Sequence, residues 1–168
     1  LDPERGANPA TQLWIIARYM ESITLCMFPF LLGKRIKVAI PIGVYSIASA
    51  IALFLIFIWD LFPTCYIEGV GLTIFKKNSE YIICILLMAA FFFLYKKKNL
   101  LDQTVYNLLA VSIVLTIIAE LAFTFYVSVY GLSNLIGHFL KIISFYLIYK
   151  AFIHTGLKKP YRLMFKEI

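Results

Sequence analysis

Long apolar stretches alternate with short polar or charged segments along the whole chain. A bilayer core about 30 Å thick needs roughly 20 helical residues to cross it, and segment 38–59 carries no charged residue. Each apolar stretch is therefore expected to form one membrane-spanning helix. The pattern predicts five spans, at residues 12–33, 36–59, 79–95, 104–130 and 132–154.

Residues that interrupt or cap helices mark the ends of these spans. Segment 33–35 (Gly-Lys-Arg) closes the first span, and segment 59–63, which begins with Trp and ends with Pro, closes the second. Segment 78–80 (Asn-Ser-Glu) is expected to cap the third span. Segment 131–134 (Gly-Leu-Ser-Asn) is expected to make a tight turn, so that the fourth and fifth spans are antiparallel neighbours.

Composition agrees with an all-α polytopic transmembrane bundle. Hydrophobic residues make up 62% of the 168 residues and charged residues 15%, whereas soluble domains contain about 45–50% and about 25%. This excludes a disordered chain, a disulfide-stapled secreted module and a DNA-binding domain, since the net charge of +7 lies mostly in clusters beside apolar segments. The expected surroundings are the lipid bilayer of the cell membrane, with no nucleic-acid partner.

Basic residues are divided unequally between the two sets of connecting segments, and cytoplasmic loops retain Lys and Arg. One set holds Lys34, Arg35, Lys37, Lys96, Lys97, Lys98, Lys158, Lys159, Arg162 and Lys166. The other set holds Arg5, Lys76 and Lys77. We therefore expect the N-terminus outside and the C-terminus in the cytoplasm, which five crossings satisfy.

Four ionisable residues fall inside the predicted spans, namely Arg18, Glu21, Glu120 and Lys141. Each costs a few kcal/mol or more at the bilayer centre unless it is paired or hydrated. Glu120 lies eleven residues before Gly131 and Lys141 lies ten after it. At 1.5 Å per residue, both come to roughly 15 Å below the turn. The spacing predicts that Glu120 and Lys141 pair.

Polar residues at helical spacing predict one polar stripe on each of three spans. The stripes consist of Arg18, Glu21 and Ser22; of Ser112, Thr116, Glu120 and Thr124; and of Asn134, His138, Lys141 and Ser144. Two interpretations remain open. The four charges sum to zero and can simply fix helix register, or, with the nearby histidine and hydroxyls, they form a ligand pocket or a proton-responsive switch.

Histidine and cysteine are too sparse for a metal site. His138 can be a satisfied polar-core residue, a ligand contact, a titrating group or, as the least favoured alternative, a metal ligand. His154 lies 16 residues further on and is expected at the membrane interface. Cys26, Cys65 and Cys84 lie in three segments without metal-binding spacing. We expect no cofactor, no metal and no disulfide.

Two segments outside the predicted spans have distinct expected roles. Segment 60–78, rich in Gly and aromatic residues, is expected outside as a re-entrant or interfacial cover over the pocket. In segment 155–168, Gly156 and Pro160 are expected to interrupt the last helix. That segment is interpreted either as a basic linker to a cytoplasmic domain or as an ordinary stop-transfer flank, so the sensor bundle itself is predicted over residues 1–154.

The chain resembles the MASE3 membrane-associated sensor domain over nearly its whole length. The resemblance is carried by segments 12–14, 18–22, 62–69, 71–73, 79–81, 119–124, 134–138, 141 and 144–151, with Pro160, Tyr161 and Phe165 beyond them. It implies an integral membrane input module of bacterial and archaeal signalling proteins, found before PAS, histidine-kinase or diguanylate-cyclase modules. Family members have further helices before the Trp-containing span, so this chain is expected to be N-terminally shortened.

These observations predict a sensory input domain, dimeric and without catalytic activity of its own, in a parent histidine kinase or diguanylate cyclase. It would sense a small ligand, a membrane property or protons, and would pass the signal through the last span. The candidate ligand-binding or switch residues are Arg18, Glu21, Glu120, Thr124, Asn134, His138, Lys141 and Ser144. The alternative is a small transporter or channel subunit that uses the charges as a substrate or proton path. A membrane-embedded enzyme is disfavoured, because no nucleophile–base or multi-ligand metal constellation is present.

Overall fold

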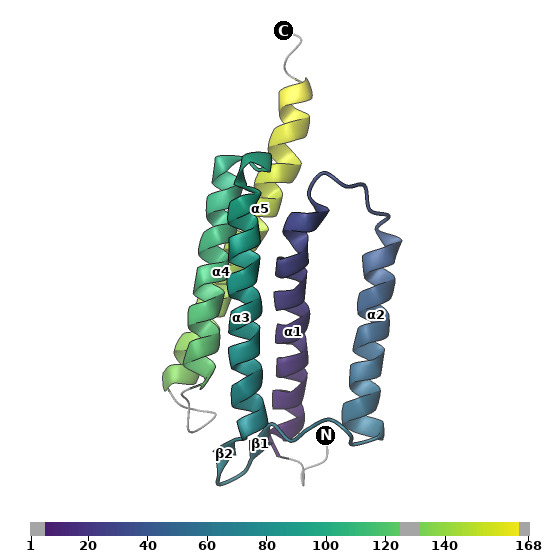
Figure 1. The fold of residues 1–168 in the computed structure, drawn as a ribbon, viewed down its shortest axis with the longest axis vertical. Helices are drawn as coiled ribbons and strands as arrows, with labels where there is room; N and C mark the ends of the chain where they lie inside the picture. The colour runs from purple at the N-terminus through teal and green to yellow at the C-terminus, as the bar shows by residue number, and fades with distance from the viewer. Residues whose placement is uncertain (1–5, 125–131, 165–168) are drawn as a thin grey trace.

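Five long helices account for most of the protein (Figure 1). The computed structural model describes residues 6–124 and 132–164, with side chains to residue 155. The elements are α1 (Asn8–Leu31), α2 (Ala39–Leu53), the π-helical turn η2 (Phe54–Ile58), β1 (Tyr66–Ile67), β2 (Gly71–Leu72), α3 (Ile74–Lys96), the 3-10 turn η3 (Lys98–Leu100), α4 (Gln103–Thr124) and α5 (Leu132–Met164). The predicted all-α bundle of five helices is confirmed.

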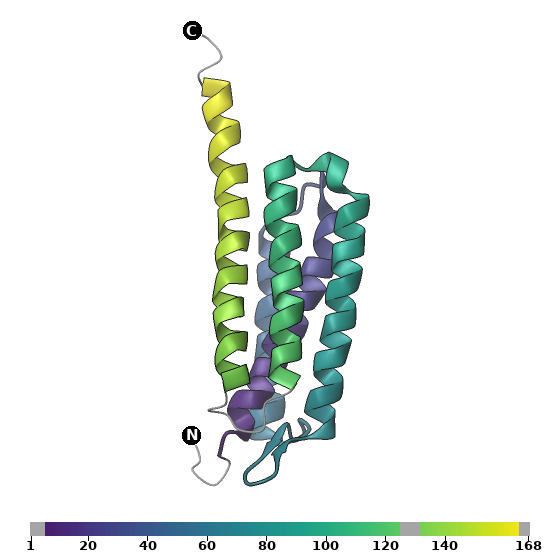
Figure 2. The same ribbon diagram turned by 90° about the vertical axis from the view of Figure 1, so that its left-hand side faces the viewer.

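Successive helices run in alternating directions, so their ends gather at two ends of the bundle (Figure 1). The start of α1, the β1–β2 hairpin and the start of α5 share one end, called here the hairpin end. The α1–α2 connection and η3 lie at the opposite end, beyond which α5 projects (Figure 2). This is the arrangement that the predicted alternation of crossings requires, while the assignment of the hairpin end to the outside stays a prediction.

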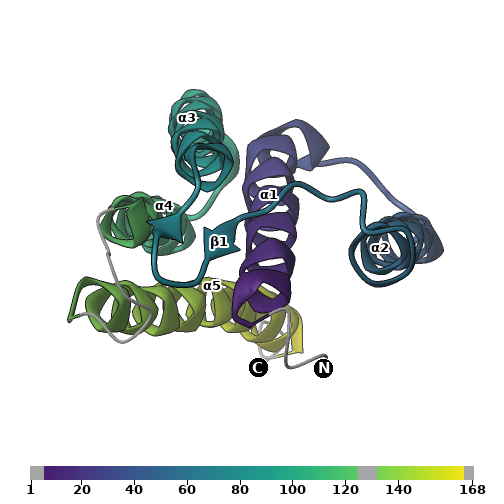
Figure 3. The ribbon, with the colours of Figure 1, turned by 90° about the horizontal axis from the view of Figure 1, so that it is seen from below.

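Four of the described helical segments are long and apolar enough to cross a membrane, rather than the five predicted. They are Ala39–Ile58, Ile74–Lys96, Gln103–Thr124 and Leu132–Thr155. The remaining helix, α1, has 24 residues, but Gln12, Arg18, Glu21 and Ser22 lower its apolar character. Three of these four are buried, and α1 lies between α3, α5 and α2 when the bundle is viewed along its axis (Figure 3). Its polar side chains therefore face protein.

The third helix begins earlier than segment 78–80 predicts, so the cap expected there is wrong. α3 starts at Ile74, where Thr73 is the N-cap and its Oγ1 accepts a hydrogen bond from the Lys76 backbone N–H at 3.2 Å. Lys76 and Glu80 then pair one helical turn apart. Because this pairing compensates the Lys76 charge, Lys76 lies inside the helix rather than in the preceding loop.

The last helix also differs from its prediction. α5 continues to Met164, so the interruption expected at Gly156 and Pro160 is wrong. The surrounding Leu, Lys, Arg and Met residues are good helix formers. Ser133 and Asn134, expected in a turn, lie in the first turn of α5. Gly131 and the end of the predicted span 104–130 lie outside the described residues.

The apolar core lies mainly between α3 and α4, away from the hairpin end. Fully buried residues of α3 pack there against buried residues of α4: Ile83, Leu87, Ala90 and Leu94 against Val105, Leu109, Ala110 and Ile113. In α2 and η2, by contrast, the buried residues are Ala52 and Ile56. Figure 3 shows α2 to one side of the bundle, next to α1. Such an exposed apolar helix suits contact with lipid.

The segment before α3 forms a short antiparallel hairpin fastened to the start of α1. Tyr66 pairs with Leu72. The Asn8 side-chain oxygen accepts hydrogen bonds from the backbone N–H groups of Cys65 (2.8 Å) and Tyr66 (3.1 Å). Gln12 Nε2 donates to two further backbone carbonyl oxygens, those of residues 62 and 63. The hairpin is therefore held by α1 through side chains of the helix's first two turns.

Candidate functional site

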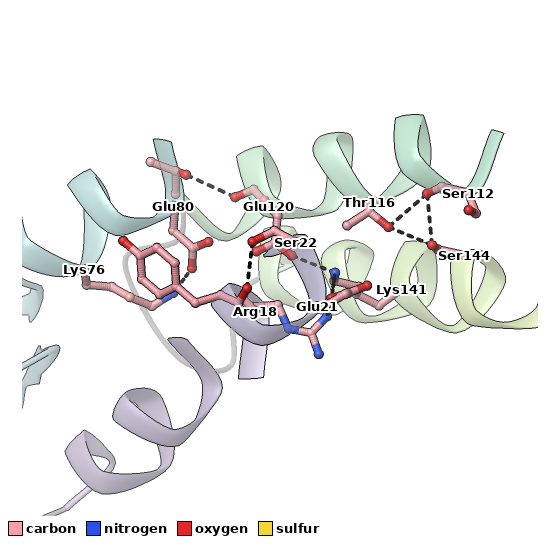
Figure 4. A network of polar contacts seen from close by, with 12 residues as sticks. Arg18, Glu21, Ser22, Lys76, Glu80, Ser112, Thr116, Glu120, Lys141 and Ser144 are labelled. Atoms are coloured by element: carbon pink, nitrogen blue, oxygen red, sulfur yellow. Dashed lines mark hydrogen bonds and ion pairs between the residues drawn. The ribbon is translucent and has the colours of Figure 1, made fainter. Parts of the chain in front are cut away.

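A chain of ion pairs joins α1, α4 and α5 in the half of the bundle nearer the hairpin (Figure 4). Glu21 Oε2 lies 2.5 Å from Arg18 Nη1 and 2.8 Å from Lys141 Nζ. Lys141 Nζ also lies 2.7 Å from Glu120 Oε1. The predicted pairing of Glu120 with Lys141 is confirmed, and all four predicted intramembrane charges belong to one network. Glu21 and Lys141 are its central residues, because each contacts two partners.

The network is buried, but its hydrogen bonding is incomplete. Glu120 is 0% exposed and Lys141 2% exposed. Both carboxylate oxygens of Glu120, the Oε1 atom of Glu21 and the Nε atom of Arg18 are buried without a hydrogen-bond partner among the described residues. An unsatisfied buried polar atom costs about 1–3 kcal/mol, and more when it is charged. Each charge therefore lies close to an opposite charge. Carboxylate oxygens of Glu21 and Glu120 nevertheless lack a hydrogen-bond donor, which a proton, a water molecule or a ligand can supply.

A second buried ion pair lies on α3. Lys76 Nζ contacts Glu80 Oε1, and the two residues are 1% and 0% exposed. The sequence interpretation missed this pair because it counted Lys76 as a loop residue. The signal that would have found it is the i,i+4 spacing of Lys and Glu on one helix face. With this pair, three basic residues (Arg18, Lys76 and Lys141) and two acidic residues (Glu80 and Glu120) are buried in the described bundle, and Glu21 is partly buried.

Two of the predicted pocket residues bond to protein groups instead. Thr124 Oγ1 donates to the Glu120 backbone oxygen at 3.1 Å. Ser144 Oγ lies 2.7 Å from Thr116 Oγ1, and both hydroxyls lie 2.9 Å from the Ser112 backbone oxygen (Figure 4). Each hydroxyl has one hydrogen, so one of the pair donates to that carbonyl and the other donates within the pair. These hydroxyls join α4 to α5.

Three aromatic rings meet near the ion pairs. Trp14 of α1, Phe123 of α4 and His138 of α5 pack edge to face, with ring centroids 5.0–5.2 Å apart. Gly137 permits this contact, because a Cβ atom there would lie 2.5 Å from the Phe123 ring. The guanidinium of Arg18 lies 4.6 Å from the centre of the Trp14 ring. Trp14 therefore touches both the aromatic cluster and the ion-pair network.

A hollow of about 140 Å³ opens beside this aromatic cluster at the hairpin end. Four helices line it, through Ala7, Ala10, Thr11, Trp14, Lys76, Phe123, Asn134 and His138. Two of the predicted site residues, Asn134 and His138, are among them, whereas Thr124 and Ser144 are not. No described residue of segment 60–73 lines the hollow, so the predicted cover is not formed by that part of the loop.

The opposite end holds a separate polar contact. His154 Nδ1 of α5 lies 3.9 Å from Asp102 Oδ1, just before α4. The backbone N–H of Thr104 donates to Asp102 Oδ1 at 2.9 Å and holds the pKa of that carboxyl below its usual range. Across residues 6–124 and 132–155, no group of three His, Cys, Asp or Glu side chains is placed to hold a metal ion.

One comparison with known proteins gave a match. The family model of MASE3, described as a membrane-associated sensor domain, matches residues 1–160. Neither the curated proteins nor the solved structures gave a match.

Proposed function

The chain belongs to the MASE3 family of membrane-associated sensor domains, and from this premise we propose that its buried ion-pair network is the switch of a sensory input domain. A stimulus at the hairpin half would change the pairing of Glu21, Glu120 and Lys141. The change would pass along α5 to an output domain in the cytoplasm. The observation that carries the proposal is the incomplete hydrogen bonding of buried charges that link three helices.

Two arrangements of the network are chemically reasonable. In the described arrangement, one oxygen of Glu21 is shared by Arg18 and Lys141, while Glu120 contacts Lys141 without hydrogen-bond geometry. Protonation of Glu120 would leave Lys141 with Glu21 as its single ionic partner, and a ligand that draws Arg18 away would leave Glu21 with Lys141 as its single partner. Because Glu21 and Lys141 lie on different helices, such a change favours a shift of α5 against α1. A bistable contact of this kind is what a signal requires.

α5 is suited to carry the shift away from the site. It is continuous from Leu132 to Met164, or 33 residues, which is about 50 Å at 1.5 Å per residue. Lys141 and Ser144 lie in its first half, and it extends past the other helices at the opposite end (Figure 2). A rigid rod delivers a rotation or translation over such a distance better than a jointed segment does.

The remaining parts of the proposal follow the predicted sidedness. The hairpin end would face the outside of the cell membrane and α5 would enter the cytoplasm, where a PAS, histidine-kinase or diguanylate-cyclase module would receive the signal. A homodimer would place two α5 helices side by side. A transporter has less support, because a path through the membrane would have to pass the apolar core between Leu87 and Leu109.

The test is the output activity of the intact signalling protein carrying Glu120→Gln or Lys141→Met, singly and together. We expect each single change to alter basal output or stimulus response, and the double change to recover part of the difference because both charges are removed at once. Lys150→Met is the matched control, since it removes one exposed basic charge from the same helix. Unchanged output in both folded single variants would refute the switch.

A further inference from the structure

We propose that the end of the bundle opposite the hairpin binds the headgroup of an anionic phospholipid, between the ends of α1 and α3. This inference does not depend on the proposed switch, which lies in the hairpin half. It is drawn from three properties of this end: a cluster of unpaired cations, an aromatic contact that brings two basic segments together, and aromatic side chains exposed directly beside the cations.

The cations of this end belong to two short segments, one between α1 and α2 and the other at the end of α3 and in η3. All are exposed, and they are Lys34, Arg35, Lys37, Lys96, Lys97 and Lys98. Across the described residues, none of them forms an ion pair with a carboxylate. Of the described acidic residues, Asp102 alone lies at this end, and it is close to His154. The end therefore has a large excess of positive charge without an internal partner.

The hairpin end has a different surface charge. Its exposed charged residues in the described chain are Asp60, Glu68 and Lys77, while Lys76 is buried with its partner. Each Lys or Arg near an anionic lipid surface raises affinity about fivefold, and the attraction is screened beyond about 8 Å at physiological salt. Helix dipoles alter the contrast little, because α1 and α3 end where α2 and α4 begin. Attraction of an anionic headgroup is therefore confined to the end opposite the hairpin.

A contact between two aromatic rings brings the two basic segments together. Phe30, in the last turn of α1, packs edge to face against Phe93, in the last turn of α3, with ring centroids 4.7 Å apart. Lys34 follows Phe30 by four residues, and Lys96 follows Phe93 by three. Both segments therefore begin beside the same contact, so that one headgroup can lie between them.

Exposed aromatic rings beside the cations favour a phospholipid over a soluble phosphate. Phe92 and Tyr95 are 51% and 52% exposed. Lys96 Nζ lies 4.5 Å from the centre of the Phe92 ring, and Lys98 Nζ lies 4.6 Å from that of Tyr95, so each ammonium is held against an apolar surface. A phospholipid joins an anionic phosphate to acyl chains and can contact both the cations and the rings. A soluble phosphate would leave the rings without a partner.

The experiment measures, by native mass spectrometry, which lipids stay bound to the full chain after its release from nanodiscs made of equal amounts of phosphatidylglycerol and phosphatidylcholine. Both lipids carry a phosphate, but the choline cation leaves phosphatidylcholine without net charge. We expect retained phosphatidylglycerol to exceed retained phosphatidylcholine by at least about 25-fold, which corresponds to two basic contacts at about fivefold each. Equal retention of the two lipids would overturn the inference.

A double variant locates the binding between the two segments. Lys34→Gln with Lys98→Gln removes one exposed cation from each segment and should lower the preference for phosphatidylglycerol about 25-fold. Lys34→Arg with Lys98→Arg keeps both charges at the same positions and should leave the preference unchanged. A glutamine double variant that keeps the preference of the unmodified chain would refute this site.

Two single variants separate this site from a general effect of net charge. Lys98→Gln and Lys77→Gln each remove one exposed lysine, but Lys77 lies at the hairpin end. We expect Lys98→Gln to lower the preference for phosphatidylglycerol about fivefold and Lys77→Gln to leave it unchanged. Equal losses in the two variants would mean that the net charge of the chain, and not this end, selects the lipid, and would overturn the inference.

Discussion

The hairpin half and the opposite half of the bundle are held together by different chemistry. Near the hairpin, α1, α4 and α5 meet through buried charges, several of whose atoms lack hydrogen bonds within the described chain. Further along, α3 and α4 meet through close-packed aliphatic side chains, and α4 meets α5 through the satisfied hydroxyls of Thr116 and Ser144.

The contrast shows where alternative arrangements of similar energy are available. Aliphatic side chains in a packed core have one good arrangement, because any displacement opens a cavity. Buried charges with several possible partners have more than one arrangement, and the balance between them changes with a single proton or ligand. We therefore expect the hairpin half to change its arrangement in response to a stimulus. The opposite half is expected to keep the helices in register during that change.

The largest effect is expected from breaking the Lys76–Glu80 pair. Glu80→Gln leaves the ammonium of Lys76 without its ionic partner at 1% exposure, and loss of one member of a buried pair costs about 3–5 kcal/mol. The double variant with Lys76→Met should recover most of this loss. Equilibrium unfolding in detergent measures both, and a double variant no more stable than the single one would contradict the assignment of a buried pair.

The next largest effect tests the apolar half. Leu87→Ala should lower the free energy of unfolding by about 2–5 kcal/mol, because Leu87 is 0% exposed and its removal leaves a cavity. Met88→Ala is the control, since Met88 is 52% exposed on the lipid side of the same helix. A loss of stability no larger than that of Met88→Ala would contradict the assignment of Leu87 to the packed apolar core.

A smaller effect is expected from pH at the hairpin itself. Burial raises the pKa of the Cys65 thiol from 9.0 to about 11. As the pH rises past 9, the unfolded chain loses this proton while the folded chain keeps it, so the folded state loses about 1 kcal/mol by pH 10. Unfolding measured at pH 7 and pH 10 should show that Cys65→Ala has the smaller pH dependence. Identical pH dependence would mean that the thiol is accessible in the folded protein.

The smallest effect is expected at the hydroxyl contact between α4 and α5. Thr116→Val keeps the shape of the side chain and removes one hydroxyl from the contact with Ser144. Polar contacts between membrane helices contribute about 0.6 kcal/mol on average, so the loss of stability should be of that size. A loss of stability as large as that of Glu80→Gln would contradict the proposed difference in stability between neutral and charged contacts.

Helical periodicity accounts for the features that the sequence predicted well. The spacing of Glu120 and Lys141 on either side of Gly131 was enough to predict their pairing, because residues at equal distances from the connection of two antiparallel helices come to the same depth. The end of α1 near Gly33 followed equally from a local signal: Gly33 has φ +78° and follows the helix, which closes at Leu31. Such features depend on the chain within one or two helices.

The features that were missed depend on several helices at once. Lys76 was assigned to a loop because segment 78–80 was expected to cap the third span. The i,i+4 spacing indicates a pair with Glu80, but only the packed bundle shows that both residues are buried. Thr124 and Ser144 lie on the predicted polar stripes, but backbone oxygens satisfy them, so they do not reach the hollow. A stripe gives the direction of a side chain and not the identity of its partner.

The sequence by itself determined that this protein is a helical membrane bundle with charges buried at one depth, because apolar length and helical spacing are local properties of the chain. The tertiary structure decided which charges share a partner, which hydroxyls are already satisfied, and that Trp14, Phe123 and His138 form the wall of one hollow. Those choices depend on the packing of four helices, through contacts between residues as distant as Glu21 and Lys141. No local pattern encodes them.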